Sequence, residues 1–189
     1  MPTFDTIVQQ LEAREPLAPL YPTQPWNQDL SRQIAQASDA ELFGTAPSSG
    51  STMSTACRAG LLLWNDDLES SHRISQGVEN ATGSFWHAIM HRREGDAANS
   101  GYWWRKTGAH PAFAEVQAEA LRVLQNESDE QAQEFAAALK RAATWLPVEF
   151  VAHCETARRD GDEADWLKRV QVVETAVLLR WCRNRIASG

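Results

Sequence analysis

Three histidines near the middle of the chain have the residue type and spacing of a metal or proton-transfer site. His87 and His91 are four residues apart, which places both side chains on one face of a helix, one turn apart. Two imidazoles in that arrangement can bind one cation, but a third ligand must come from another segment. His72 ends the apolar stripe of the preceding expected helix and is the natural candidate. We therefore predict that His72, His87 and His91 are ligands of a divalent metal ion.

The same histidines also support a site without metal. A histidine held by a carboxylate, such as His72 or His87 beside Asp67, is a general acid or base near neutral pH. In this interpretation the catalytic residues are His72, His87, His91 and Asp67. A third interpretation gives the histidines no chemistry and makes them hydrogen-bonded residues at a seam between helices. The zinc-protease pattern His-Glu-x-x-His is excluded, because Ala88 stands where that pattern requires glutamate.

Cationic and aromatic side chains follow the histidine pair closely. Arginine can hold a carboxylate or phosphate with two hydrogen bonds, and aromatic rings can form the wall of a pocket. The candidate ligand-binding residues are Arg92, Arg93, Tyr102, Trp103 and Arg105. Adjacent residues of a helix point in different directions, so we expect one of Arg92 and Arg93 to be solvated.

Charge is distributed unevenly along the chain. The net charge is −7, which disfavours nucleic-acid and anionic-membrane binding, because both need a basic surface. Residues 85–113 contain four basic and two acidic side chains, a local charge of +2 on a body of −9. A cationic segment on an acidic body favours a small anionic ligand over a polymer.

The cysteines and the hydropathy pattern suit a cytoplasmic protein. Cys57, Cys154 and Cys182 are widely spaced and form no Cys-x-x-Cys pair, as expected for reduced thiols. The first residues lack the basic and apolar regions of a signal peptide, and the apolar runs are too short to span a bilayer. Homodimer formation stays open, because acidic helical proteins of this size often pair.

Helical periodicity dominates the chain, and the alternation typical of strands is nearly absent. We expect a single all-α domain over residues 1–189, an irregular bundle of roughly eight helices without a significant sheet. Residues 1–26 should form an opening helix and a proline-rich arm packed on the body. A long helix is expected over residues 52–76, with a loop over 46–51 before it and shorter helices over 84–93 and 102–107 after it.

Two stretches in the central third of the chain resemble a group of uncharacterised microbial proteins of similar length. One is the block Trp-His-Ala-Ile-Met-His-Arg-Arg-Glu-Gly-Asp from Trp86 to Asp96, and the other is Leu-Trp-Asn-Asp-Asp-Leu from Leu63 to Leu68. No activity is known for that group, so the resemblance implies no mechanism. Its recurring block coincides with the histidine cluster chosen above on chemical grounds.

These features favour an enzyme that acts on a small anionic metabolite, using histidine acid–base chemistry or a divalent metal ion. Two alternatives remain open. A non-catalytic ligand-binding module would hold its ligand with the arginines and tryptophans and keep the histidines in structural hydrogen bonds. A helical interaction or scaffold protein would expose an apolar patch, for which the final helix is the first place to look.

Overall fold

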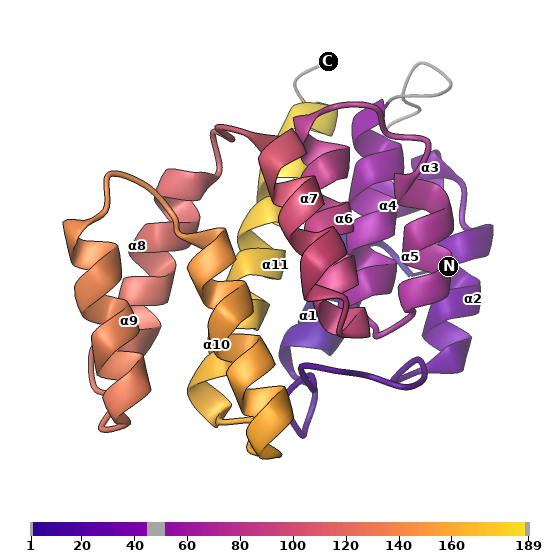
Figure 1. Ribbon diagram of the computed structural model, residues 1–189. Helices are drawn as coiled ribbons and strands as arrows, with labels where there is room; N and C mark the ends of the chain where they lie inside the picture. Colours follow the sequence, from indigo (N-terminus) through magenta and orange to yellow (C-terminus); the bar gives the residue numbers. More distant parts are fainter. Residues whose placement is uncertain (1, 45–51, 188–189) are drawn as a thin grey trace.

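The computed structural model describes residues 2–44 and 52–187, and this part of the chain is helical without any strand (Figure 1). The all-α class expected from periodicity is confirmed. The eleven helices of the described residues are α1 (Phe4–Glu12), α2 (Gln28–Gln36), α3 (Asp39–Phe43), α4 (Thr52–Trp64), α5 (Leu68–Ser75), α6 (Ala81–Glu94), α7 (Ala97–Thr107), α8 (Phe113–Leu124), α9 (Glu130–Arg141), α10 (Pro147–Asp160) and α11 (Asp165–Ala187). Their number exceeds the expected eight, partly because one long helix is divided. The loop expected over residues 46–51 lies outside the described residues.

The helix expected over residues 52–76 is in fact two helices, because the chain turns sharply after Trp64. Asp66 has a φ of 64°, in the left-handed region that L residues other than glycine rarely adopt. Two buried arginines hold this turn: Arg14 and Arg93 pair with the Asp66 carboxylate at 2.9 and 2.5 Å. We call these three residues the Asp66 clamp. Its cations come from distant parts of the chain, so local periodicity could not reveal the break.

Two other helices start earlier than expected, because an earlier residue provides the cap. Asn80 rather than Ser84 caps α6, where its side chain accepts a backbone hydrogen bond at 3.0 Å. Asp96 caps α7 in the same way, so that helix begins at Ala97 instead of residue 102. The extra turn of α7 places Ser100 against α6, where its hydroxyl donates to the Ala88 carbonyl at 2.7 Å.

Helix α6 lies at the centre of the molecule, and residues 82–93 are all buried. It packs against α4, α5 and α7, which lie around it in Figure 1. The approach of α4 is close: a Cβ added at Gly60 would lie 2.5 Å from the Trp86 ring, so the absence of a side chain permits the contact. The histidines of α6 are therefore carried by a helix that is packed on every side.

The two arginines near the end of α6 both point into the protein, which corrects the expectation that one would be solvated. Each is 2% exposed. Arg92 pairs with Glu174 of α11 at 2.7 Å. Arg93 belongs to the Asp66 clamp and also donates to the Pro19 carbonyl at 3.1 Å. Since a buried charge is tolerated only when it is paired, both arginines serve as structural ties between α6 and its neighbours.

The proline-rich arm lies against the helices at Pro19 and Leu20. The Pro19 carbonyl accepts hydrogen bonds from Arg93 of α6 and Gln171 of α11, each at 3.1 Å. Leu20 is buried, and its amide donates to the Glu163 carboxylate at 3.0 Å. The arm therefore connects segments that are far apart in the sequence.

The surface of the described residues exposes few large hydrophobic side chains, namely Tyr102 and Val148. Neither lies on α11, where the scaffold alternative placed an apolar patch. Across residues 2–44 and 52–187, none of the helices has the length and hydropathy needed to cross a bilayer.

The three cysteines are buried in the core, on α4, α10 and α11, and Cys57 lies near Cys182. Burial raises the pKa of each thiol, to about 12 for Cys154 and Cys182 and well above the ordinary value for Cys57. They therefore pack as small apolar side chains rather than as nucleophiles.

His110, in the turn before α8, is a buried histidine outside the central cluster. Its Nδ1 atom accepts from the Ala112 amide at 3.2 Å, and its Nε2 atom lies 3.2 Å from the Thr82 hydroxyl. This pairing selects the neutral ring, because an Nδ1 that accepts cannot carry a proton. Burial first, and then the charge of Arg185, lower the pKa of His110 to about 4.

The buried His110 should make the protein less stable in acid. The unfolded chain binds a proton there near pH 6.5, but the folded protein does so only near pH 4. The contribution is therefore intact above pH 6.5 and is lost as the pH falls to about 4, by up to about 3 kcal/mol. Urea unfolding at about pH 7.5 and about pH 4.5 measures this loss. Between the two pH values, the free energy of unfolding should fall less for His110→Asn than for the wild type. Equal losses in the two proteins would contradict this assignment.

Candidate functional site

Three imidazoles meet between α5 and α6. The ligand atoms of His72, His87 and His91 all lie within 4.8 Å of one another. The ring centres are 5.0 Å apart for His72 and His87, 5.2 Å for His72 and His91, and 5.9 Å for His87 and His91. The structure therefore brings together the three residues that the spacing singled out, and we call them the histidine cluster.

The short turn between α5 and α6 produces this arrangement. Helix α5 ends at Ser75 and α6 begins at Ala81, so the two helices pack as direct neighbours. The four-residue spacing of the histidines on α6 turns both rings toward the same side. At the other end of α5, the Asp66 clamp joins the start of the helix to Arg93 of α6. The cluster is thus held from both ends of α5.

His87 is the most enclosed member of the cluster, with an exposure of 2%. Its ring forms a hydrogen bond with the Gly83 backbone, while its Nε2 atom is buried without a partner. The Trp103 indole stacks on the ring at 4.1 Å between centres and an interplanar angle of 17°. Burial, and next the neighbouring His72, lower the pKa of His87 to about 4. The ring is therefore neutral at pH 7, which is the form that metal ions bind.

His91 is buried and has a carboxylate beside it. Its Nδ1 atom lies 3.0 Å from a Glu94 carboxylate oxygen, and its Nε2 atom lies 3.2 Å from the Asn99 amide nitrogen. When Glu94 accepts the Nδ1 proton, the lone pair of the ring is on Nε2. A carboxylate at the second nitrogen is the arrangement that fixes the tautomer of metal-binding histidines.

His72 is half-buried and closes the cluster from the side of α5. Its Nε2 atom lies 3.0 Å from the side-chain nitrogen of Gln76, one turn later. Burial first, and then His91, lower the pKa of His72, while the carboxylate of Glu94 acts in the opposite direction. This ring is therefore also biased toward its neutral form.

The carboxylate that contacts the cluster belongs to Glu94 and not to Asp67. Asp67 instead caps α5, where its side chain accepts from the Ser70 amide at 3.1 Å. The prediction that Asp67 orients an imidazole therefore does not describe the contacts of this structure. Glu94 lies seven residues after His87, and this spacing places both residues on the same face of α6.

The five ligand-binding candidates differ in position. Trp103 stacks on His87. Tyr102 is exposed and meets Trp103 edge to face, and Arg105 is also exposed. Arg92 and Arg93 are each 2% exposed and pair with carboxylates of the protein, so burial keeps a ligand from them. The anion clamp expected from the three arginines is therefore not formed in this structure.

Lys106 is the cation near the cluster that the sequence analysis missed. Its Nζ atom lies 4.7 Å from the centre of the Trp103 ring and 5.4 Å from that of Tyr102. The three-residue spacing of Trp103 and Lys106 places both on one face of α7, which was the available signal. Among the described residues, no carboxylate forms a salt bridge with Lys106.

Two cavities border the histidine cluster from different sides. One, of about 460 Å³, is lined by His87, Trp103 and Lys106 together with the turn between α5 and α6. The other, of about 370 Å³, is lined by His72, Glu94 and residues of the arm and of the start of α5. We call them the α7 cavity and the arm cavity. The cluster can therefore be approached from two directions that differ in charge.

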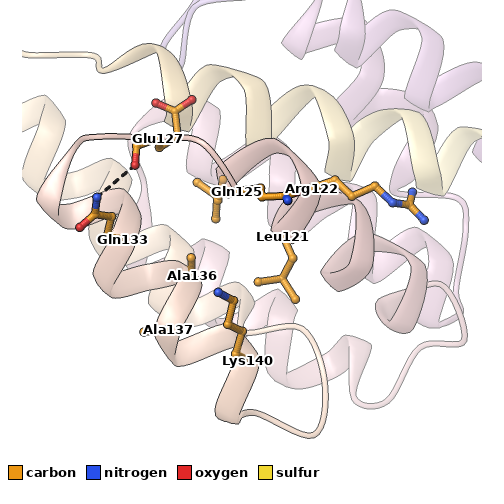
Figure 2. Close-up of a pocket in the computed structure, with 9 residues that line it drawn as sticks. Leu121, Arg122, Gln125, Glu127, Gln133, Ala136, Ala137 and Lys140 are labelled. Carbon is orange, nitrogen blue, oxygen red and sulfur yellow. Dashed lines mark hydrogen bonds between the residues drawn. The ribbon is translucent and has the colours of Figure 1, made fainter.

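A larger cavity, of about 560 Å³, lies elsewhere, between α8 and α9 (Figure 2). Leu121 of α8 points toward α9, where Ala136 and Lys140 line the cavity, whereas the Arg122 side chain points away from them. Arg122 already pairs with Glu119 at 2.7 Å. None of the five histidines lines this cavity, so its size alone does not make it the chemical site.

Comparison with known proteins adds no assignment: no family model matches the chain, and neither a curated protein nor a solved structure is similar to it at a significant level.

Proposed function

We propose that His72, His87 and His91 bind one divalent transition-metal ion, and that this centre is the active site of an enzyme acting on a small anionic metabolite. The observation that carries the proposal is the convergence of three imidazoles, one ligand atom of each lying within 4.8 Å of the others, and the His87 Nε2 atom is buried without a hydrogen-bond partner. A buried polar atom without a partner is costly, and a bound cation would remove that cost.

The contacts of the cluster support a metal centre over metal-free acid–base catalysis. A general base is most efficient when its pKa lies near the working pH. Burial lowers the pKa of His87 to about 4, which suits a neutral metal ligand better than a base near neutral pH. Glu94 beside His91 supplies the outer carboxylate that metal-binding histidines commonly use.

The ligand set favours zinc or a chemically similar ion. Imidazole nitrogen suits zinc, copper, iron and nickel, whereas magnesium and calcium prefer oxygen. Three protein ligands leave a fourth tetrahedral position for water or substrate, which distinguishes catalytic zinc sites from closed structural ones. Such an ion lowers the pKa of a bound water to about 7 and thereby supplies hydroxide for hydrolysis near neutral pH.

Zinc titration of the apoprotein tests the proposal. The wild-type protein should bind one zinc ion per chain, and His72→Ala should weaken binding by about 100-fold or more, because one of three ligands is lost. His153→Ala is the matched control, since His153 is a half-buried histidine like His72 but packs against Phe135 and Trp166, away from the cluster. Isothermal calorimetry and circular dichroism measure affinity and folding. A wild-type protein without zinc affinity, or equal affinities in both variants, would reject the metal centre.

A further inference from the structure

We propose that the substrate reaches the metal through the α7 cavity, with one oxygen at the open coordination position and an anionic group on the Lys106 ammonium. The ligand class is a small molecule that carries a carboxylate or a phosphate. This inference rests on the metal centre proposed above and adds to it the side of entry and the residue that recognises the charge.

The walls of the α7 cavity provide the first argument. His87 and Trp103 form one wall, and Lys106 lies beside them on the same face of α7. His87 is the cluster histidine in this lining, and Gln76, which also lines the cavity, contacts His72. Its volume, about 460 Å³, lies within the range of small-molecule sites.

The charge of Lys106 provides the second argument. Its ammonium group is exposed, lies over two aromatic faces and has no carboxylate partner among the described residues. An unpaired cation beside a metal position is suited to hold the second end of a bridging anion. Glu79, also exposed, is the acidic residue that lines this cavity.

The negative charge of the arm cavity provides the third argument. Asp67, Glu69 and Glu94 line it beside His72. These carboxylates repel an anionic substrate, whereas they attract the metal ion itself. The arm cavity therefore disfavours an anionic substrate, whereas the α7 cavity holds one lysine and one glutamate and offers the Lys106 ammonium as a partner for an anion.

Cobalt-loaded protein allows a direct test, because the visible spectrum of bound Co²⁺ responds when a ligand enters its coordination sphere. Titration with inorganic phosphate and, separately, with acetate should change the spectrum of the wild-type protein. Lys106→Met keeps most of the side-chain volume but removes the charge. For whichever of the two anions binds the wild type more tightly, this variant should lower the affinity by about tenfold. The anion with the stronger response identifies a phosphate or a carboxylate as the recognised group.

Two controls separate the possible failures. Arg105→Met removes the same charge from the neighbouring residue, which is exposed and does not line the α7 cavity, and should leave anion affinity unchanged. Free imidazole, a neutral metal ligand, should bind equally to the wild type and to Lys106→Met if the metal position is intact. Equal anion affinity in wild type and Lys106→Met would overturn the inference and leave the metal centre standing. Absence of a cobalt spectrum in the wild type would overturn both.

Discussion

Asp66→Asn is expected to lower the free energy of unfolding by about 4 kcal/mol and to weaken zinc binding by about tenfold or more. The Asp66 carboxylate neutralises Arg14 and Arg93, and the side chains of all three are 7% exposed or less. Removing the negative charge leaves two buried cations unpaired. Asparagine tolerates a positive φ, so the backbone turn itself is not the cause of the loss.

The effect on zinc follows from the position of the Asp66 clamp. Asp66 lies just before α5, which carries His72, and Arg93 lies two residues after His91 on α6. One ion pair therefore sets the position of the third ligand relative to the other two. Asp66 acts through His72 and is a positioning residue, because it does not contact the imidazoles itself.

A second buried carboxylate provides the matched control for the clamp. Glu174 pairs with Arg92 at 2.7 Å and is fully buried, but it lies on α11 and its ion-pair and hydrogen-bond partners are Arg92 and Trp145 rather than residues of α5. Glu174→Gln should destabilise the fold by a similar amount, about 3 to 5 kcal/mol, and leave zinc affinity nearly unchanged. Urea unfolding and zinc calorimetry on both variants separate the two effects. If Asp66→Asn retained wild-type zinc affinity, the positioning role would be wrong, whatever its stability.

Gly83→Ala should cost about 3 kcal/mol or more and disturb the same site from the other end of α5. A Cβ at position 83 would lie 1.9 Å from the Val78 carbonyl oxygen and 2.7 Å from its Cβ atom. Because the nearest atom belongs to the backbone, the first turn of α6 must move as a unit. His87 lies one turn after Gly83 and would move with it, so we also expect weaker zinc binding.

Gly77→Ala is the control for this prediction, because it changes a glycine in the same turn without a clash. A Cβ there would meet its nearest neighbour, the Ile74 carbonyl oxygen, at an ordinary 3.6 Å. The free energy of unfolding of Gly77→Ala should stay within about 0.5 kcal/mol of that of the wild type. Urea unfolding of the two variants measures the difference. Comparable stabilities for Gly83→Ala and Gly77→Ala would show that the turn yields easily and would refute the close packing of α6 on Val78.

The features that the sequence revealed are those that depend on neighbouring residues. The stripe of Phe113, Val116, Ala120 and Leu124 has helical spacing, and these are the buried residues of α8. The capping box that begins α3 is likewise local in sequence. Convergence of the histidines could be anticipated because a four-residue spacing and one short turn are enough to produce it.

The features that the sequence concealed depend on contacts between distant segments. The break at Asp66 needs Arg14 from the opening region and Arg93 from α6, and neither is visible in the local pattern. Arg92 looked available for a ligand because its partner, Glu174, lies on the last helix. Lys106 was overlooked because an isolated lysine is usually solvated, and only the fold places it over Trp103.

The buried thiols can be used to measure partial unfolding of this protein. Cys57, Cys154 and Cys182 are each 1% exposed or less, so an alkylating reagent reaches them only after the surrounding helices separate. Cys154 belongs to α10, whereas Cys57 of α4 and Cys182 of α11 lie near each other and report on the packing of those two helices. The order in which they are alkylated under native conditions would therefore reveal which helices detach first and whether the core opens in one cooperative event.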